Sequence, residues 1–236
     1  CLPNVKQKVS KYVSHTTSEV VEPAITAIQK ETEHLLERCL RHNLHVLRID
    51  ETLVWPDYTH EGLRKVPSTA RQYESLKLLQ GQIFKFASEV QTHEMTTQES
   101  EEIGHALHAA RLNLHAAKIF KDIQHNFEDF DQSDNPFLRK AYANFRQRFI
   151  ELSMQLVREQ ELDSRTDITA LHDQMMATVK RKDEAFIHFI SSAVGKEGAW
   201  ADMDISSAII VNRSFIHASQ HLINAWSELQ GKMAEV

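Results

Sequence analysis

The chain has 236 residues, with 27 Lys and Arg against 33 Asp and Glu, and its formal net charge is −6. Acidic and basic residues are interleaved, so the sequence offers no basic face of the kind that nucleic-acid binding needs. No run of 18 apolar residues is present to span a membrane, and two cysteines, Cys1 and Cys39, are too few for a disulfide framework.

Long helices are predicted throughout, because the chain has only 6 Gly and 5 Pro and its apolar residues recur every three or four positions. Pro23 suits the first turn of a helix, and Thr96 with Glu99 has capping-box spacing. The three helices of the first half are expected to run from Pro23 to before Trp55, over 68–93, and from Thr96 to Asp129.

Three more helices are predicted in the second half. Asn135 is a suitable N-cap with Pro136 in the first turn, and Ser164 with Asp167 resembles a second capping pair. Gly195 is the expected end of the fifth helix. The sixth helix covers about 204–229, and with no strand-like alternation anywhere the predicted class is all-α.

The third helix carries an all-polar line at helical spacing between two apolar lines, which suits a helix packed against two neighbours. Residues 111–117 also align with 213–219, at an offset of 102 positions, so the third and sixth helices are candidate equivalents. We therefore expect six long antiparallel helices in two repeated three-helix bundles. The expected divisions are a basic connector at 1–19, a first bundle at 20–130 and a second at 131–236.

These features resemble the PhoU family, and in particular the PhoU-like domain at the cytoplasmic end of bacterial sodium/phosphate cotransporters. The likeness covers most of 20–230. It is carried by Tyr73-Glu-Ser-Leu-Lys77, by Ala117-Lys-Ile-Phe-Lys-Asp122, by Asp122 with Asn126-Phe127, and by Val211-Asn212-Arg213. The resemblance implies a helical regulatory domain.

In that family, Glu-x-x-x-Asp motifs in both halves can hold multinuclear metal clusters. Here the corresponding residues read Lys118-x-x-x-Asp122 and Gln220-x-x-x-Asn224. A lysine ammonium repels a cation, and amides bring no charge to offset dehydration of a hard metal. We expect neither a metal cluster nor another cofactor.

A di-metal carboxylate protein of the ferritin-like type is the alternative from a different class. Glu31-x-x-His34 and Glu102-x-x-His105 have its Glu-x-x-His spacing. With 14 His in the chain, however, about one such pair is expected by chance. Histidines three or four apart, such as His217 and His221, would also bind zinc or nickel adventitiously.

The polar line of the third helix has two interpretations. It is either the solvated face of an amphipathic helix, with Lys118 and Asp122 as a weak i, i+4 pair, or a docking and anion-sensing face. The second interpretation rests on Arg111, Lys118 and Arg213 lying at equivalent positions of related helices. The candidate binding residues are Arg111, His115, Lys118, Asp122, Asn126, Asn212, Arg213 and His217.

No catalytic set is visible: the chain has no serine elbow and no glycine-rich phosphate loop. Lys6, Lys8 and Lys11 precede the first strong helix, as expected for a segment that follows a membrane span on its cytoplasmic side. Since the chain does not begin with Met, we expect it to be a processed or truncated piece. A cloning boundary, or less often a lipoprotein whose mature first residue is Cys1, would explain this start.

The expected function is therefore a non-enzymatic regulatory domain of a sodium-dependent phosphate cotransporter at the cytoplasmic face of the inner membrane. Its expected partner is the membrane-embedded transporter portion of the same or a neighbouring chain, with a homodimer as a second contact. A free-standing PhoU-type phosphate-signalling adaptor is the nearest alternative.

Overall fold

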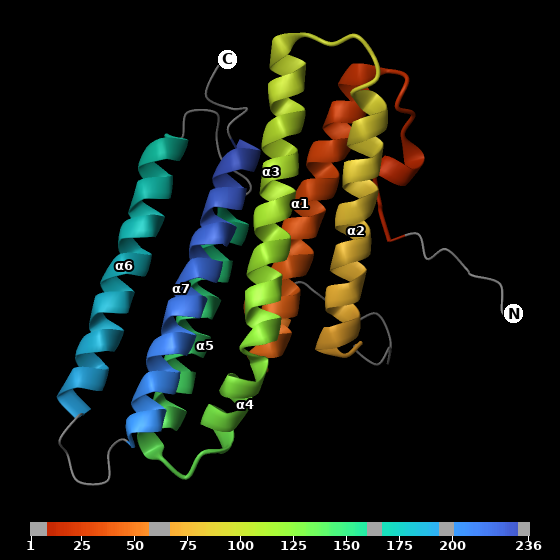
Figure 1. The fold of residues 1–236 in the computed structure, drawn as a ribbon. Coiled ribbons are helices and arrows are strands. Elements are labelled where there is room, and N and C mark those ends of the chain that lie inside the picture. Colours follow the sequence, from red (N-terminus) through yellow and green to blue (C-terminus); the bar gives the residue numbers. More distant parts are fainter. Residues whose placement is uncertain (1–8, 57–66, 160–166, 194–200, 231–236) are drawn as a thin grey trace, which may run out of the picture.

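The protein is all-α, as predicted, over the part that the computed structural model describes, residues 9–56, 67–159, 167–193 and 201–230 (Figure 1). Two short 3-10 helices, η1 (Val13–His15) and η2 (Glu51–Leu53), lie before and after the first α-helix. The α-helices of these ranges are α1 (Val21–Val46), α2 (Thr69–Val90), α3 (Thr97–Asp122), α4 (Gln124–Gln132), α5 (Pro136–Arg158), α6 (Ile168–Ala193) and α7 (Asp202–Gln230).

Several helix starts lie where capping residues predicted them. Thr96 and Glu99 form the predicted capping box at the start of α3. The Asn135 side chain accepts a hydrogen bond from the Phe137 N–H at 2.9 Å, with Pro136 in the first turn of α5. These contacts satisfy N–H groups that have no partner inside the helix. The predicted signals at Ser164 and Gly195 lie outside the described residues.

One helix ends before Trp55 as predicted, and another is interrupted where the sequence predicted continuation. α1 ends at Val46, well before Trp55, in a Schellman motif: the Ile49 N–H donates to the Leu44 carbonyl, and Arg48 takes a positive φ of 52°. The helix expected to reach Asp129 is interrupted at Ile123, where φ is −97° and ψ is 6°. The chain then continues as α4.

The interruption at Ile123 redirects the chain toward α5. On α4, Phe127 is buried with its ring centroid 5.7 Å from that of Phe145 and 6.1 Å from that of Tyr142. Phe130 is buried in the same cluster. Because the apolar spacing continues through the break, the sequence pattern favoured a single helix.

α1, α2 and α3 pack against one another, while α7 contacts α3, α5 and α6. The most extensive helix contact is between α3 and α7, which run antiparallel through the middle of the molecule (Figure 1). Among the described residues, no helix is both long and apolar enough to cross a bilayer.

Two buried apolar clusters fill the interior. One lies among α2 and the first parts of α1 and α3. The other joins α4, α5, α6 and α7 to the second part of α1, through Leu36, Leu40 and Leu44, and to Phe120 of α3. The second cluster therefore draws on the first half of the chain, and the division at 130/131 stays a prediction.

Candidate functional site

The predicted polar line of α3 lies on the surface. Arg111, His115, Lys118 and Asp122 are all exposed. Lys118 donates to the Asp122 carboxylate at 2.5 Å, so these two residues form the i, i+4 pair that one interpretation expected. Exposed pairs of this kind contribute little to helix stability, because water screens their charges. Asn126 is partly buried and lies on α4, beyond the interruption at Ile123.

The structure does not bring Arg111 and Arg213 together. α3 and α7 are antiparallel, and His115 lies opposite His221. In this register Arg213 lies opposite Ile123, at the C-terminal end of α3. Arg111 is twelve residues before Ile123, which is about 18 Å along the axis of α3 at 1.5 Å per residue. The two arginines, although equivalent in the proposed repeat, cannot hold one small anion together.

Three of the predicted binding residues, all on α7, line the same groove. Asn212, Arg213 and His217 line a groove between α6 and α7 with a volume of about 300 Å³. Arg213 and His217 are exposed, one turn apart. The other residues that line this α6–α7 groove are Asp183, Ile187, Ile209, Ile216 and Gln220.

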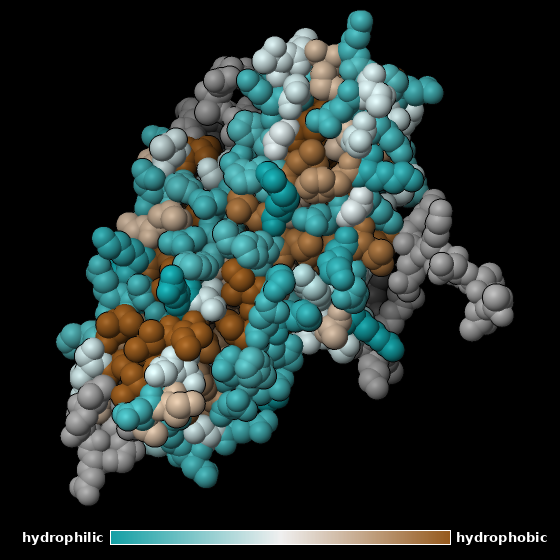
Figure 2. All heavy atoms as spheres, viewed as in Figure 1, coloured by the Kyte–Doolittle hydropathy of each residue, from teal (hydrophilic) through white to brown (hydrophobic). Residues whose placement is uncertain are grey.

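The groove continues into an exposed hydrophobic area. Ile209 is 43% exposed and Ile210 63% exposed on α7, and Ile187 of α6 and Met203 are exposed as well. Figure 2 shows hydrophobic side chains gathered over the ends of α6 and α7 that lie lowest in Figure 1. Exposed apolar patches next to polar residues often mark interaction surfaces.

Asn212 belongs to a buried polar network behind the groove. Arg148 of α5 donates from Nη1 to the Asn212 Oδ1 at 2.8 Å, and Asn212 donates from Nδ2 to the Asp183 Oδ1 at 2.6 Å. Asn212 is 2% exposed. This Arg148 network, formed by Arg148, Asn212 and Asp183, links α5, α7 and α6.

The Arg148 guanidinium is enclosed by aromatic rings. Its central carbon lies 4.7 Å from the ring centroid of Phe215, 5.7 Å from that of Phe145 and 5.9 Å from that of Phe186. Burial lowers the pKa of Arg148 to about 10, opposed by the charge of Asp183. The guanidinium therefore stays charged at neutral pH and is stabilised by the ring faces.

Sequence reasoning did not single out Arg148 or Asp183. The available signal was an arginine within the apolar face of α5, one position before Phe149 and one turn after Phe145. Arginine is rarely buried unless it is paired, so a position of this kind indicates a buried polar network.

A second polar arrangement joins α3 to α7 on the surface. Glu228 of α7 lies 2.5 Å from the Nδ1 of His105 and 2.9 Å from the Nδ1 of His108. Burial of Glu228 acts to raise its pKa, but the two histidines outweigh it, and the pKa lies below its usual value. Further along, His115 stacks on His221.

The two Glu-x-x-His pairs have other partners. The Glu31 carboxylate is buried and accepts hydrogen bonds from the backbone N–H groups of Lys11, Tyr12 and Val13, and it lies 2.9 Å from His34 Nδ1. His105 contacts Glu228, as described above. Among the described residues, no group of three or more His, Cys, Asp or Glu is placed to hold a metal ion.

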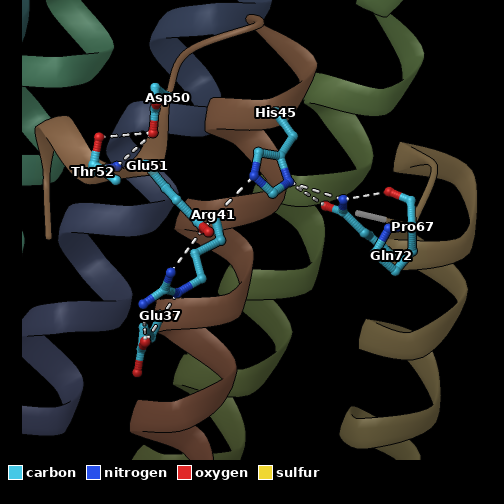
Figure 3. Close-up of polar contacts among 8 residues, drawn as sticks. All are labelled: Glu37, Arg41, His45, Asp50, Glu51, Thr52, Pro67 and Gln72. Carbon is cyan, nitrogen blue, oxygen red and sulfur yellow. Dashed lines mark hydrogen bonds and ion pairs between the residues drawn. The ribbon is translucent and has the colours of Figure 1, made fainter. Parts of the chain in front are cut away.

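A polar cluster also surrounds the end of α1 (Figure 3). Arg41 donates to the buried Glu51 at 2.7 Å and to Glu37 at 2.8 and 3.0 Å. His45 Nδ1 lies 2.9 Å from Gln72 Nε2, which in turn lies 2.8 Å from the Pro67 carbonyl. The cluster ties the segment after α1 and the start of α2 to α1, which is a structural role.

Searches of protein families, of curated proteins and of solved structures find no match to this chain. The PhoU resemblance therefore rests on the sequence features given above.

Proposed function

We propose that this chain is a non-enzymatic, PhoU-like regulatory domain that acts in sodium-dependent phosphate transport through helix-bundle contacts. Its place would be the cytoplasmic face of the inner membrane, beside the membrane-embedded part of the transporter. The two three-helix bundles of the sequence interpretation belong to this proposal, with α3 and α7 as their contacting members.

The observation that carries the proposal is the α6–α7 groove. Ile187, Ile209 and Ile216 give it an apolar wall, and Arg213 and His217 lie on its rim. Apolar grooves of this kind accept amphipathic helices, which insert side chains at i, i+3, i+4 spacing.

The charge of Arg213 on the rim indicates which kind of helix would bind in the groove. Asp183 accepts a hydrogen bond from Asn212, and no hydrogen bond or ion pair engages Arg213 within the described ranges. Arginine binds carboxylates through paired N–H donors. We infer that the occupant is a helical segment of the transporter's membrane portion with an apolar face and an adjacent Asp or Glu.

A site-specific photocrosslinker tests this proposal in cells. Placed at Ile209, it should react with a peptide from the membrane portion of a sodium/phosphate cotransporter. The matched control is Leu78 of α2, which is 55% exposed and lies away from the groove. Crosslinking to a second copy of this chain would contradict the transporter helix as the occupant and identify a homodimer contact instead. Crosslinking to a soluble phosphate-signalling protein would favour the free-standing adaptor.

A functional measurement accompanies the crosslinking. Ile209→Asp and Arg213→Glu should each change sodium-dependent phosphate uptake at unchanged protein level, because one places a charge in the apolar wall and the other reverses the rim charge. Leu78→Asp should leave uptake as in the wild type. Uptake unaffected by both groove variants would contradict the proposed function.

A further inference from the structure

Arg148 itself lines a second hollow. It is a cavity of about 90 Å³ between α5, α6 and α7, and none of its lining residues lines the groove. Its apolar lining residues are Leu152, Met175, Val179 and Phe215. The polar and charged ones are Arg148, Glu151, Gln155, Thr178, Lys182 and Ser219. This cavity is therefore distinct in its lining from the proposed docking groove.

Arg148 faces the cavity with unused donors. A guanidinium has five N–H donors, and the described residues accept one hydrogen bond from Arg148, at Asn212. The Asp183 carboxylate is linked to Arg148 through the Asn212 amide rather than directly. Arg148 is 6% exposed, so most of its charge is removed from water without a paired carboxylate. Buried cations are normally paired, because desolvating them alone is costly.

The other cation of the cavity is already paired. Lys182 of α6 forms an ion pair with Glu151 of α5, and both side chains are partly exposed. This pair lies at the outer edge of the cavity and joins the two helices across it. A ligand inside would therefore meet one unpaired cation, Arg148, and a predominantly apolar wall.

We propose that this cavity binds a short-chain monocarboxylate. The carboxylate would accept two hydrogen bonds from the free N–H groups of Arg148, and the alkyl chain would pack on Leu152, Met175 and Val179. Size supports a small ligand: a 150 Å³ cavity holds the six carbon atoms of benzene, so a hollow of about 90 Å³ encloses roughly four non-hydrogen atoms. A carboxylate and the first carbons of its chain would fill it, and the last carbons of butyrate would extend toward its open side. Inorganic phosphate is disfavoured, because Arg148 is the one unpaired cation among the described lining residues and the Glu151 carboxylate would repel the additional negative charge.

NMR titration of the isotope-labelled whole chain tests the proposal, with sodium butyrate as the probe. Butyrate should shift the Arg148 side-chain N–H signal and the methyl signals of Met175 and Val179 in a saturable manner. Butanol, which has the same chain without the charge, and inorganic phosphate at equal ionic strength should not. Absence of saturable butyrate shifts, or equal shifts with phosphate, would overturn the proposal.

Variants separate the cavity from other anion sites. Val179→Phe should fill the cavity and weaken butyrate binding at least tenfold, whereas Leu78→Phe, the same enlargement at an exposed position of α2, should leave it unchanged. Arg148→Met should weaken binding at least tenfold as well. Should that variant fail to fold, Val179→Phe and the comparison of butyrate with butanol decide the matter, and undiminished binding to Val179→Phe would refute the cavity as the site.

Discussion

The imidazole rings of His115 and His221 stack across the contact between α3 and α7, with centroids 4.6 Å apart and planes inclined by 29°. His217 lies one turn from His221 on α7. A positive charge on any of these rings disfavours a charge on its neighbours. The largest helix contact of the molecule thus has a group at its surface that responds to pH.

Removal of the His115 ring should raise the pKa of His221. Burial lowers the pKa of His221, and the neighbouring His115 and His217 lower it further. In His115→Ala the pKa of His221 should move toward its ordinary value, measured by NMR titration of the ring protons. His125→Ala, at an exposed position of α4, is the control. An unchanged His221 titration in His115→Ala would show that the stacking has no electrostatic effect.

His42 should make the protein lose stability in mild acid. Burial lowers its pKa to about 4, and the nearby His45 also acts in that direction. In the unfolded chain the value is about 6.5, so the unfolded state binds the proton first. The stabilising contribution is complete above pH 6.5 and is lost as pH falls toward 4. At about 1.4 kcal/mol per unit of pKa, the loss reaches roughly 3 kcal/mol.

Urea unfolding between pH 7.5 and 4.5 measures this effect. His42→Gln lacks the titrating ring, so its unfolding free energy should fall less steeply with pH than that of the wild type. The exposed His93→Gln should follow the wild-type profile. Parallel profiles for His42→Gln and the wild type would contradict the assignment.

The helix starts could be predicted because they depend on local chemistry. Thr96 with Glu99 and Asn135 with Pro136 act within one turn of chain, and the structure confirms both. The end of α1 could not be predicted in this way, because Arg48 occupies a left-handed position where glycine is the usual signal.

The candidate site was only partly predictable for a related reason. Helical spacing predicts that Arg213 and His217 are exposed and that both lie close to Asn212. The partners of Asn212 come from α5 and α6, through Arg148 and Asp183. Which helices meet, and in which register, depends on tertiary packing that a single sequence does not specify.

Glu31 should fasten the segment before α1 to the helix. Burial acts to raise the pKa of its carboxyl, but hydrogen bonds from His34 and from three backbone N–H groups outweigh it, and the pKa lies below the ordinary value. Glu31→Gln should lower the unfolding free energy by about 2–4 kcal/mol at pH 7, because charged acceptors form the stronger hydrogen bonds.

The difference in unfolding free energy between the wild type and Glu31→Gln should depend on pH. The folded pKa is depressed, so the contribution is present above the unfolded value near 4.5 and is lost as pH falls through the folded pKa. The unfolding free energies of the wild type and Glu31→Gln should therefore approach each other as the pH falls below 4.5. Glu101→Gln, at an exposed position of α3, should differ from the wild type by less than about 0.5 kcal/mol. A constant difference across this pH range would count against an ionised Glu31.

Asn212 lines the groove, and we expect it also to stabilise the packing of α5, α6 and α7. Among the described side chains, its amide is the only hydrogen-bonded link between Arg148 and Asp183. Asn212→Ala leaves both charged groups without that partner, and we expect a loss of about 2–4 kcal/mol in urea unfolding. Arg213→Ala, one residue further on α7 and exposed, should cost less than about 0.5 kcal/mol. Similar unfolding midpoints for the two variants would mean that water replaces the amide, and that the Arg148 network does not hold α5, α6 and α7 together.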